Sequence, residues 1–132
     1  MLTPEQIAAP GTESAHQKAL FAWIAQQTDY PELKLAFAIP NGGLRDKVTA
    51  ARLKAEGAKA GVWDIFLPVP RGRWHGLFIE MKVGNNVLTT PQTDFISKLA
   101  DNYAFMVCYS WEEARGALLW YMEKGAYYAN YA

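Results

Sequence analysis

Two stretches decide the fold: Gly61-Val62-Trp63-Asp64-Ile65-Phe66-Leu67-Pro68-Val69 and Gly76-Leu77-Phe78-Ile79-Glu80-Met81-Lys82-Val83. Both are rich in β-branched and aromatic residues, and the turn-forming run Pro70-Arg71-Gly72-Arg73-Trp74 lies between them, which is typical of a β-hairpin. If the turn is centred on Gly72, the numbers of paired residues sum to twice 72. The sequence therefore predicts that Asp64 lies opposite Glu80.

The two faces of this hairpin differ in polarity. Side chains alternate between sheet faces, so Glu80 and Lys82 share one face. The opposite face is uninterrupted and apolar, and we expect it to face the core; it consists of Ile65, Leu67, Leu77, Ile79 and Met81. The polar face is predicted to bring two carboxylates and an ammonium group together at the edge of the sheet, beside a cleft that can admit DNA.

This charged group is suited to phosphodiester chemistry. Two like charges directly opposite on antiparallel strands destabilise the pair by roughly 0.2–1 kcal/mol, and a cation removes that penalty. Mg²⁺ or Mn²⁺ prefers oxygen ligands, here the carboxylates of Asp64 and Glu80 and the carbonyl of Met81. Lys82 can position or deprotonate the attacking water, or stabilise charge on phosphate. The alternative is a solvated cross-strand charge cluster with no catalytic role.

Length and composition favour one domain that spans residues 1–132 and folds without disulfides. The single Cys108 lies in an apolar run that reads as a buried strand. The N-terminus has no basic region followed by an apolar core, and no stretch approaches the roughly 20 apolar residues of a membrane span. We expect a soluble intracellular protein with no membrane partner.

The net charge is zero, but the charge is unevenly distributed. Between Arg45 and Lys82 there are eight basic residues against four acidic ones, a surplus of four that the rest of the chain cancels. If Asp64 and Glu80 bind metal, the surroundings become positive, as phosphate binding requires. An ordinary solvated helix and turn would give the same count.

The remaining segments indicate an α/β fold in the order α-β-α-β-β-α-β-α, with helices covering the sheet. Thr12 is the expected N-cap of the first helix, Thr90 caps the helix after the hairpin, and Ser110 opens the last helix with a capping box. We predict strands at residues 33–39 and 105–109 and a short helix at 46–56. Residues 77–109 are predicted to form a strand–helix–strand crossover.

Three ordered runs resemble a known family: Ile39-Pro40-Asn41-Gly42-Gly43, Lys54-Ala55-Glu56-Gly57-Ala58-Lys59-Ala60-Gly61-Val62-Trp63-Asp64, and His75-Gly76-Leu77-Phe78-Ile79-Glu80-Met81-Lys82. They are similar to the virus-type replication-repair nuclease (VRR-NUC) domain of the PD-(D/E)xK superfamily. The likeness continues through Leu88-Thr89-Thr90-Pro91-Gln92 and extends from about Glu13 to Glu113. It implies a restriction-endonuclease-like fold with a central mixed sheet flanked by helices, and a metal-dependent DNA endonuclease.

The resemblance also implies roles for single residues. Asp64 and Glu80 become metal ligands and Lys82 the catalytic lysine. Glu13 matches an acidic residue of the first helix that helps to bind metal, and Gln92 matches a glutamine that organises the site. One departure is clear, because the proline that often precedes the family's aspartate is Trp63 here. Proline supplies no ligand, so this change does not endanger the chemistry.

Candidate DNA contacts surround this motif. The glycines of Asn41-Gly42-Gly43 allow either a tight turn or a loop whose backbone approaches phosphate. The basic candidates for phosphate contacts are Arg45, Arg52, Arg71 and Arg73, each of which can equally be a solvated charge. His16 and His75 are expected to be structural.

The C-terminal end is rich in aromatic residues: Trp111, Trp120, Tyr121, Tyr127, Tyr128 and Tyr131. These can complete the core, stack on bases or form a subunit interface. Compact viral members of the resembling family are homodimers that act on branched DNA, which favours an interface and a location in the host cytoplasm if the protein is viral. The expected activity is junction resolution; the alternatives are a flap, nicking or restriction-like nuclease, or a non-catalytic DNA-binding module.

Overall fold

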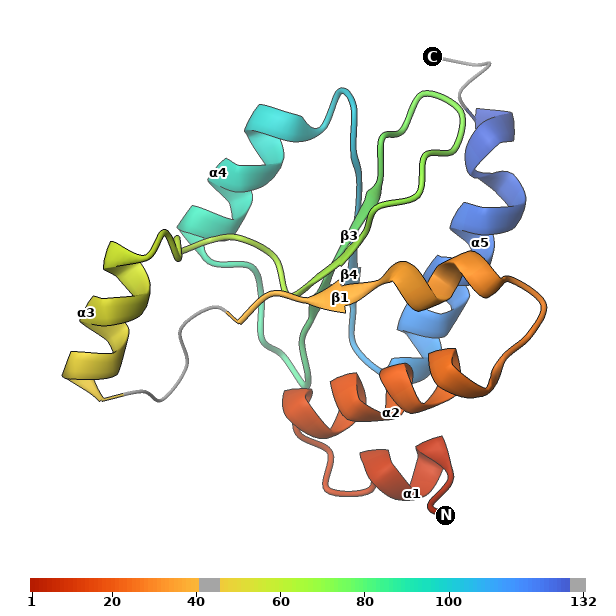
Figure 1. Ribbon diagram of the computed structural model, residues 1–132, viewed down its shortest axis with the longest axis horizontal. Coiled ribbons are helices and arrows are strands. Elements are labelled where there is room, and N and C mark those ends of the chain that lie inside the picture. Colours follow the sequence, from red (N-terminus) through yellow and green to blue (C-terminus); the bar gives the residue numbers. More distant parts are fainter. Residues whose placement is uncertain (41–45, 129–132) are drawn as a thin grey trace.

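The centre of the molecule is a four-stranded mixed sheet in the order β1-β2-β3-β4, seen in a computed structural model that describes residues 1–40 and 46–128 (Figure 1). The strands are β1 (Phe37–Ala38), β2 (Ile65–Leu67), β3 (Leu77–Met81) and β4 (Ala104–Cys108). β1 pairs with β2 and β2 with β3 in antiparallel fashion, whereas β3 and β4 are parallel. The predicted hairpin and crossover are therefore confirmed, with α4 (Thr90–Leu99) connecting the parallel pair.

The described residues form five further helical segments: α1 (Pro4–Ala8), α2 (Glu13–Gln26), the 3₁₀ helix η1 (Pro31–Leu35), α3 (Lys47–Ala55) and α5 (Trp111–Tyr128). The predicted order of elements is confirmed from α2 onward. The sequence analysis missed α1, although Thr3 and Gln6 form a capping box at its start. No helix among residues 1–40 and 46–128 is both long enough and apolar enough to cross a membrane.

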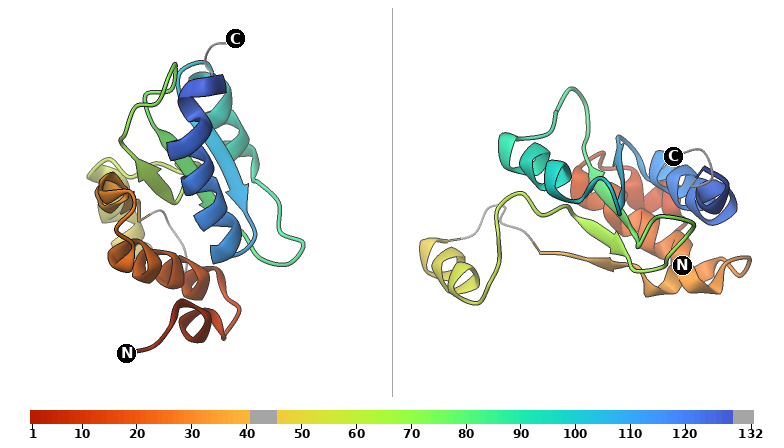
Figure 2. Two further views of the ribbon diagram at one scale, coloured as in Figure 1. Left: turned by 90° about the vertical axis from the view of Figure 1, so that its right-hand side faces the viewer. Right: turned by 90° about the horizontal axis from the view of Figure 1, so that it is seen from above.

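One face of the sheet contacts α2 and α5. The predicted apolar set on β2 and β3 is completely buried, each residue having less than 2% exposure. It packs with Leu20 and Ile24 of α2 and with Leu118 and Tyr121 of α5 in one hydrophobic cluster. Figure 2 shows these two helices on the same side of the strands. The core thus lies where strand alternation predicts it.

The other face contacts α4 through aromatic rings. Phe78 of β3 stacks on Phe105 of β4 at 5.1 Å between ring centroids, and Phe95 of α4 meets Phe78 edge-on at 5.2 Å. Phe66 of β2 extends this layer by its contact with Phe78 at 4.5 Å. Because Asp64 and Glu80 belong to the same face, their side chains lie beside a packed layer and not on an open surface.

Two local predictions are wrong. Residues 33–39 form the end of η1 and the two-residue strand β1 instead of one long strand. Pro31 presets a helical φ at the first position of η1, and within that turn only Leu33 is buried, which does not fit strand alternation. The N-cap of α4 is Thr89 and not Thr90, because the Thr89 hydroxyl accepts the Gln92 N–H.

Candidate active site

The predicted hairpin register is confirmed. Ile65 pairs with Ile79 and Leu67 with Leu77, so continuing the ladder by one residue sets Asp64 opposite Glu80. Glu80 lies on β3, which has β2 on one side and β4 on the other. The site is therefore at the end of two neighbouring strands in the interior of the sheet, and the expectation that it lies along the sheet edge is wrong.

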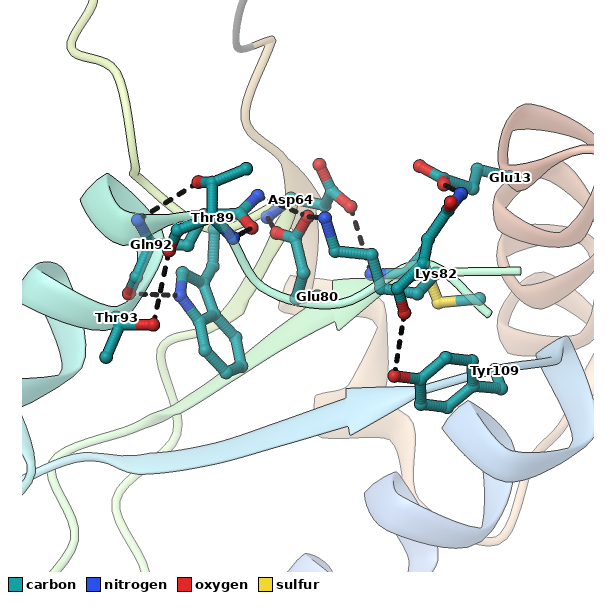
Figure 3. A network of polar contacts seen from close by, with 11 residues as sticks. Glu13, Asp64, Glu80, Lys82, Thr89, Gln92, Thr93 and Tyr109 are labelled. Carbon is teal, nitrogen blue, oxygen red and sulfur yellow. Dashed lines mark hydrogen bonds and ion pairs between the residues drawn. The ribbon is translucent and has the colours of Figure 1, made fainter. Parts of the chain in front are cut away.

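Glu80 is the centre of a polar network (Figure 3). Its Oε1 accepts the backbone N–H of Asp64 at 3.1 Å, and its Oε2 accepts the side-chain N–H of Gln92 at 2.7 Å. The ammonium of Lys82 lies 3.5 Å from the same Oε2. Both carboxylate oxygens are thus engaged, and the carboxylate has a single orientation.

Asp64 is fixed by the backbone on two sides. Its Oδ2 accepts the N–H of Met81 at 3.0 Å, across the hairpin. Its own carbonyl accepts the N–H of Ile39 at 2.7 Å, which joins the end of β1 to the site. The Met81 side chain is buried on the core face. Its carbonyl as a metal ligand stays a prediction.

Glu80 is buried, Asp64 is partly buried, and the charge of Asp64 acts on Glu80. Glu80 is only 3% exposed and Lys82 7% exposed, so these two side chains are not solvated, whereas Asp64 is partly exposed. Burial, and then the charge of Asp64, raises the pKa of Glu80 to about 7, although Lys82 opposes this shift. Burial also raises the pKa of Asp64, the Met81 N–H opposes it, and the charge of Glu13 adds to it. The protein holds two carboxyl groups where a proton or a cation must accompany them.

Glu13 is in the first turn of α2 and approaches the site from another direction. Its Oε2 accepts the side-chain N–H of Asn86 at 3.2 Å, and the backbone carbonyl of Asn86 accepts the hydroxyl of Tyr109 at 2.9 Å. The charge of Glu13 raises the pKa of Asp64, so the two carboxylates interact electrostatically. Sequence reasoning missed Asn86 and Tyr109, which no local pattern connects to Glu13.

The donor set suits a hard divalent cation. It offers carboxylate oxygens from Asp64 and Glu80, whose mutual repulsion and desolvation a cation relieves. Within the described ranges, no three His, Cys, Asp or Glu side chains are already arranged around one point to hold a metal. A cation would thus have two protein carboxylates as its core ligands, with Glu13 and the Met81 carbonyl as candidates to complete the set, and would retain positions for water and phosphate.

Gln92 lies in the first turn of α4 and contacts Glu80, and its organising role stays a prediction. Thr89 and Gln92 form a capping box, in which the Thr89 N–H donates to the Gln92 Oε1 at 2.9 Å. This leaves the amide nitrogen of Gln92 facing Glu80. The Thr89-x-x-Gln92 spacing was available in the sequence as a capping signal, but was not used there to place the helix start.

The candidate DNA contacts fall into three groups. Asn41, Gly42, Gly43 and Arg45 lie outside the described residues. Arg52 is exposed on α3, whose residues are all at least partly exposed, and Figure 1 shows α3 standing apart from the sheet. Arg71 and Arg73 lie in the β2–β3 turn, at the opposite end of the hairpin from Asp64 and Glu80.

The histidines and aromatic residues serve the fold where the structure describes them. His16 accepts the N–H of Trp111 at the start of α5, and the ring of His75 contacts Tyr103. Trp111 and Tyr121 are buried in the core, so the expectation of an interface does not apply to these two. Cys108 is buried as predicted, and burial raises the pKa of its thiol to about 12.

Comparison with known proteins agrees with this fold. The family model described as VRR-NUC domain matches residues 3–112. A solved structure titled "VRR_NUC domain protein" is 28% identical, with a TM-score of 0.71 over 85% of this chain and 88% of that one. No curated protein matches the sequence. The chain belongs to the VRR-NUC domain family, a family of nucleases of the PD-(D/E)xK type.

Proposed function

We propose that this protein is a metal-dependent DNA endonuclease whose site consists of Asp64, Glu80 and Lys82, supported by Gln92 and Glu13. One observation carries the proposal: the partly buried carboxyl group of Asp64 lies opposite the buried carboxyl group of Glu80, beside the buried Lys82. Such a group is costly for a fold that does not use it. A divalent cation held by these carboxylates would remove the cost.

Asp64 and Glu80 would hold Mg²⁺ or Mn²⁺, with Glu13 and the carbonyl of Met81 as further ligands. When bound, such a cation supplies Lewis-acid activation of water and neutralisation of phosphate charge. The residues of this chain set the geometry, since the Met81 N–H fixes one carboxylate and Gln92 the other. Hydrolysis joins the water oxygen to phosphorus as the bond to the leaving strand breaks, and the leaving oxygen takes up a proton.

Lys82 has the second role. Its ammonium lies 3.5 Å from Glu80, on the same sheet face, and its exposure of 7% shields it from bulk solvent. A positive charge in such surroundings interacts more strongly with phosphate than it would in water. Lys82 therefore stabilises the negative charge that develops on the phosphate during attack.

DNA would reach the site along the side that carries α3. Three exposed basic residues lie on this helix: Lys47, Arg52 and Lys54. The chain runs from α3 directly back to Asp64, so contacts between α3 and the DNA backbone would place a phosphate near the carboxylates. In contrast, Arg71 and Arg73 are too far along the hairpin to share the phosphate held at Glu80.

We further infer that the substrate is branched DNA and that the active form is a homodimer. One protomer carries one site, whereas resolving a four-way junction requires two symmetric incisions. A two-fold dimer supplies both sites in the symmetry of the substrate. The resemblance to compact, junction-cleaving members of the family favours this over flap, nicking or restriction-like cleavage.

The test is a substrate panel. Purified protein is incubated with four-way junction, flap, single-stranded and linear duplex DNA, with Mg²⁺ or Mn²⁺, beside Glu80→Ala and Lys82→Ala. Symmetric junction incision that both variants lose is the expected result, together with a dimer mass by light scattering. Equal cleavage by the variants contradicts the site. Binding with no metal-dependent cleavage contradicts the enzyme and favours a DNA-binding module.

A further inference from the structure

We propose that Trp63 is a positioning residue of this site, which acts through Gln92 on Glu80. This inference rests on the proposed function, but its first test does not. The indole N–H of Trp63 donates to the backbone carbonyl of Gln92 at 3.1 Å. Gln92 donates to Glu80 at 2.7 Å, and Glu80 accepts the N–H of Asp64 at 3.1 Å. Because Asp64 is bonded to Trp63 along the chain, these contacts close a ring of four residues, of which Figure 3 labels Asp64, Glu80 and Gln92.

A closed ring fixes the carboxylate more firmly than an open chain of contacts does. If the Trp63 link is removed, Glu80 keeps its direct partners, but Gln92 is held by Thr89 without the indole and positions the carboxylate less firmly. A functional carboxylate needs a position accurate to about half an ångström, which residues behind it must provide. Trp63 can provide it, because it is buried and its ring meets Phe105 edge-on at 5.0 Å between centroids.

The orientation of the Gln92 amide is also determined. Its Oε1 accepts the Thr89 N–H at 2.9 Å, so the nitrogen and not the oxygen faces Glu80. The backbone of the same residue is held by two groups, the hydroxyl of Thr89 and the indole of Trp63. Side chain and backbone of Gln92 are therefore fixed together at the first turn of α4.

Gly61 brings Trp63 to this helix. It has a φ of +89°, and a Cβ at this position would overlap the carbonyl of Pro91. The backbone before Trp63 therefore lies directly against the first turn of α4, at a distance that only glycine permits. The close contact of Gly61 with Pro91 and the indole hydrogen bond of Trp63 have the same result, since both hold residues 61–64 against α4 behind Glu80.

A second tryptophan shows that packing alone does not require such a partner. The indole N–H of Trp74 is buried and has no hydrogen-bond partner among the described residues. Trp74 lies in the turn at the far end of the hairpin. Trp74→Phe removes an unpaired N–H and Trp63→Phe removes a paired one, so the two substitutions form a matched comparison.

The experiment has two arms. In metal-free protein, NMR measures hydrogen exchange of the Gln92 side-chain amide; calorimetry then measures Mg²⁺ affinity. For Trp63→Phe we expect exchange to be faster by about tenfold or more and the Mg²⁺ Kd to rise by about 10-fold, the size of effect that residues behind a metal ligand have. Trp74→Phe should leave both within twofold. Metal-free DNA affinity should not change in either variant.

The outcomes are distinguishable. Unchanged Gln92 exchange in Trp63→Phe overturns the proposal, and so does faster exchange with unchanged Mg²⁺ affinity, since Trp63 is then a packing residue. Equal losses in the two variants also overturn it. If the wild-type protein binds no Mg²⁺, the proposed function fails, while the exchange measurement still decides whether Trp63 holds Gln92 in place.

Discussion

The two ends of the β2–β3 hairpin both carry charged residues, but the charges are paired and partly exposed at one end and repelling and largely buried at the other. In the turn, Arg71 forms an ion pair with Glu32 at 3.1 Å, and both side chains are partly exposed. Arg73 donates to the carbonyl of Asp101 and lies over the ring of Trp74 at 4.7 Å. At the other end, Asp64 and Glu80 are placed opposite each other in a largely buried position, with Lys82 as their cationic partner.

This difference separates charges that serve the fold from charges that, on the proposed function, bind metal and phosphate. Each arginine of the turn has a polar partner close by. Exposed ion pairs of this kind contribute about 0–1 kcal/mol to stability. The Asp64 end retains a repulsion that the fold alone does not require. A binding site whose ligand-holding groups reduce the stability of the free protein is expected to have such repelling charges.

The largest contrast between the two ends should be in catalysis. Lys82→Ala removes the cation that we propose acts on the phosphate, and should lower the rate of DNA cleavage by about 10²–10⁴-fold. Arg71→Ala removes an equal charge from the turn and should leave the rate within about threefold. Single-turnover cleavage with saturating Mg²⁺ measures both, and circular dichroism checks that each variant is folded. Similar losses of cleavage rate in both variants would contradict the proposed difference between the two ends of the hairpin.

Two glycines with positive φ give the next effect. Gly61 (φ +89°) is blocked by Pro91, whereas Gly57 (φ +107°) has open space around it. Gly61→Ala should lower the free energy of unfolding by about 2–4 kcal/mol, because backbone strain and a steric overlap add. Gly57→Ala should cost only the strain, about 1 kcal/mol. Urea denaturation measures both, and equal losses would show that residues 61–64 can move away from α4.

The pH dependence of stability should reveal the repelling carboxyls. Glu80 has a pKa of about 7 in the folded protein against 4.5 for an ordinary glutamate, so the folded state retains a proton that the unfolded state has lost. The contribution of Glu80 to metal-free stability is therefore full below pH 4.5 and is lost as the pH rises to about 7, by about 1–3 kcal/mol. Mg²⁺ should restore stability at pH 8. The same measurement on Glu80→Ala gives the reference. The assignment would be contradicted if the free energy of unfolding of the metal-free wild type, relative to that of Glu80→Ala, rose over this pH range.

The smallest effect is a gain. Asp64→Asn preserves an oxygen for the Met81 N–H and removes one of the repelling charges, so metal-free protein at pH 8 should be more stable by about 1 kcal/mol while cleavage is lost. At the other end, Glu32→Gln breaks an ion pair and should reduce stability by about 0–1 kcal/mol. Thermal unfolding without metal compares the signs. If both substitutions destabilise the protein, the charges at both ends of the hairpin stabilise the fold, and the contrast between them is contradicted.

Sequence reasoning was strongest where the physical rule is local. The turn centred on Gly72 gave the register, because antiparallel pairing follows from the turn, and alternation then identified the buried face. Thr12 was recognised as a cap since its hydroxyl serves a residue three positions away, the N–H of Ala15. Strand pairing and capping need only neighbouring residues to be known.

The rest depends on contacts that neighbours do not encode. Glu80 and Lys82 are buried because the crossover through α4 packs on their face, which the hairpin alone does not reveal. The contact of Asn86 with Glu13 joins residues 73 positions apart. The role of Trp63 required the position of the Gln92 carbonyl, so the sequence could identify this residue only as a departure from the family pattern.

Mn²⁺ binding followed by electron paramagnetic resonance tests the central claim most directly, since it asks whether the repelling carboxyls exist to hold a cation. We predict that wild-type protein and Arg71→Ala bind Mn²⁺ with equal affinity, and that Asp64→Asn and Glu80→Ala weaken binding by at least about 10-fold. Equal Mn²⁺ binding by all four proteins, or no binding by the wild type, would contradict the account.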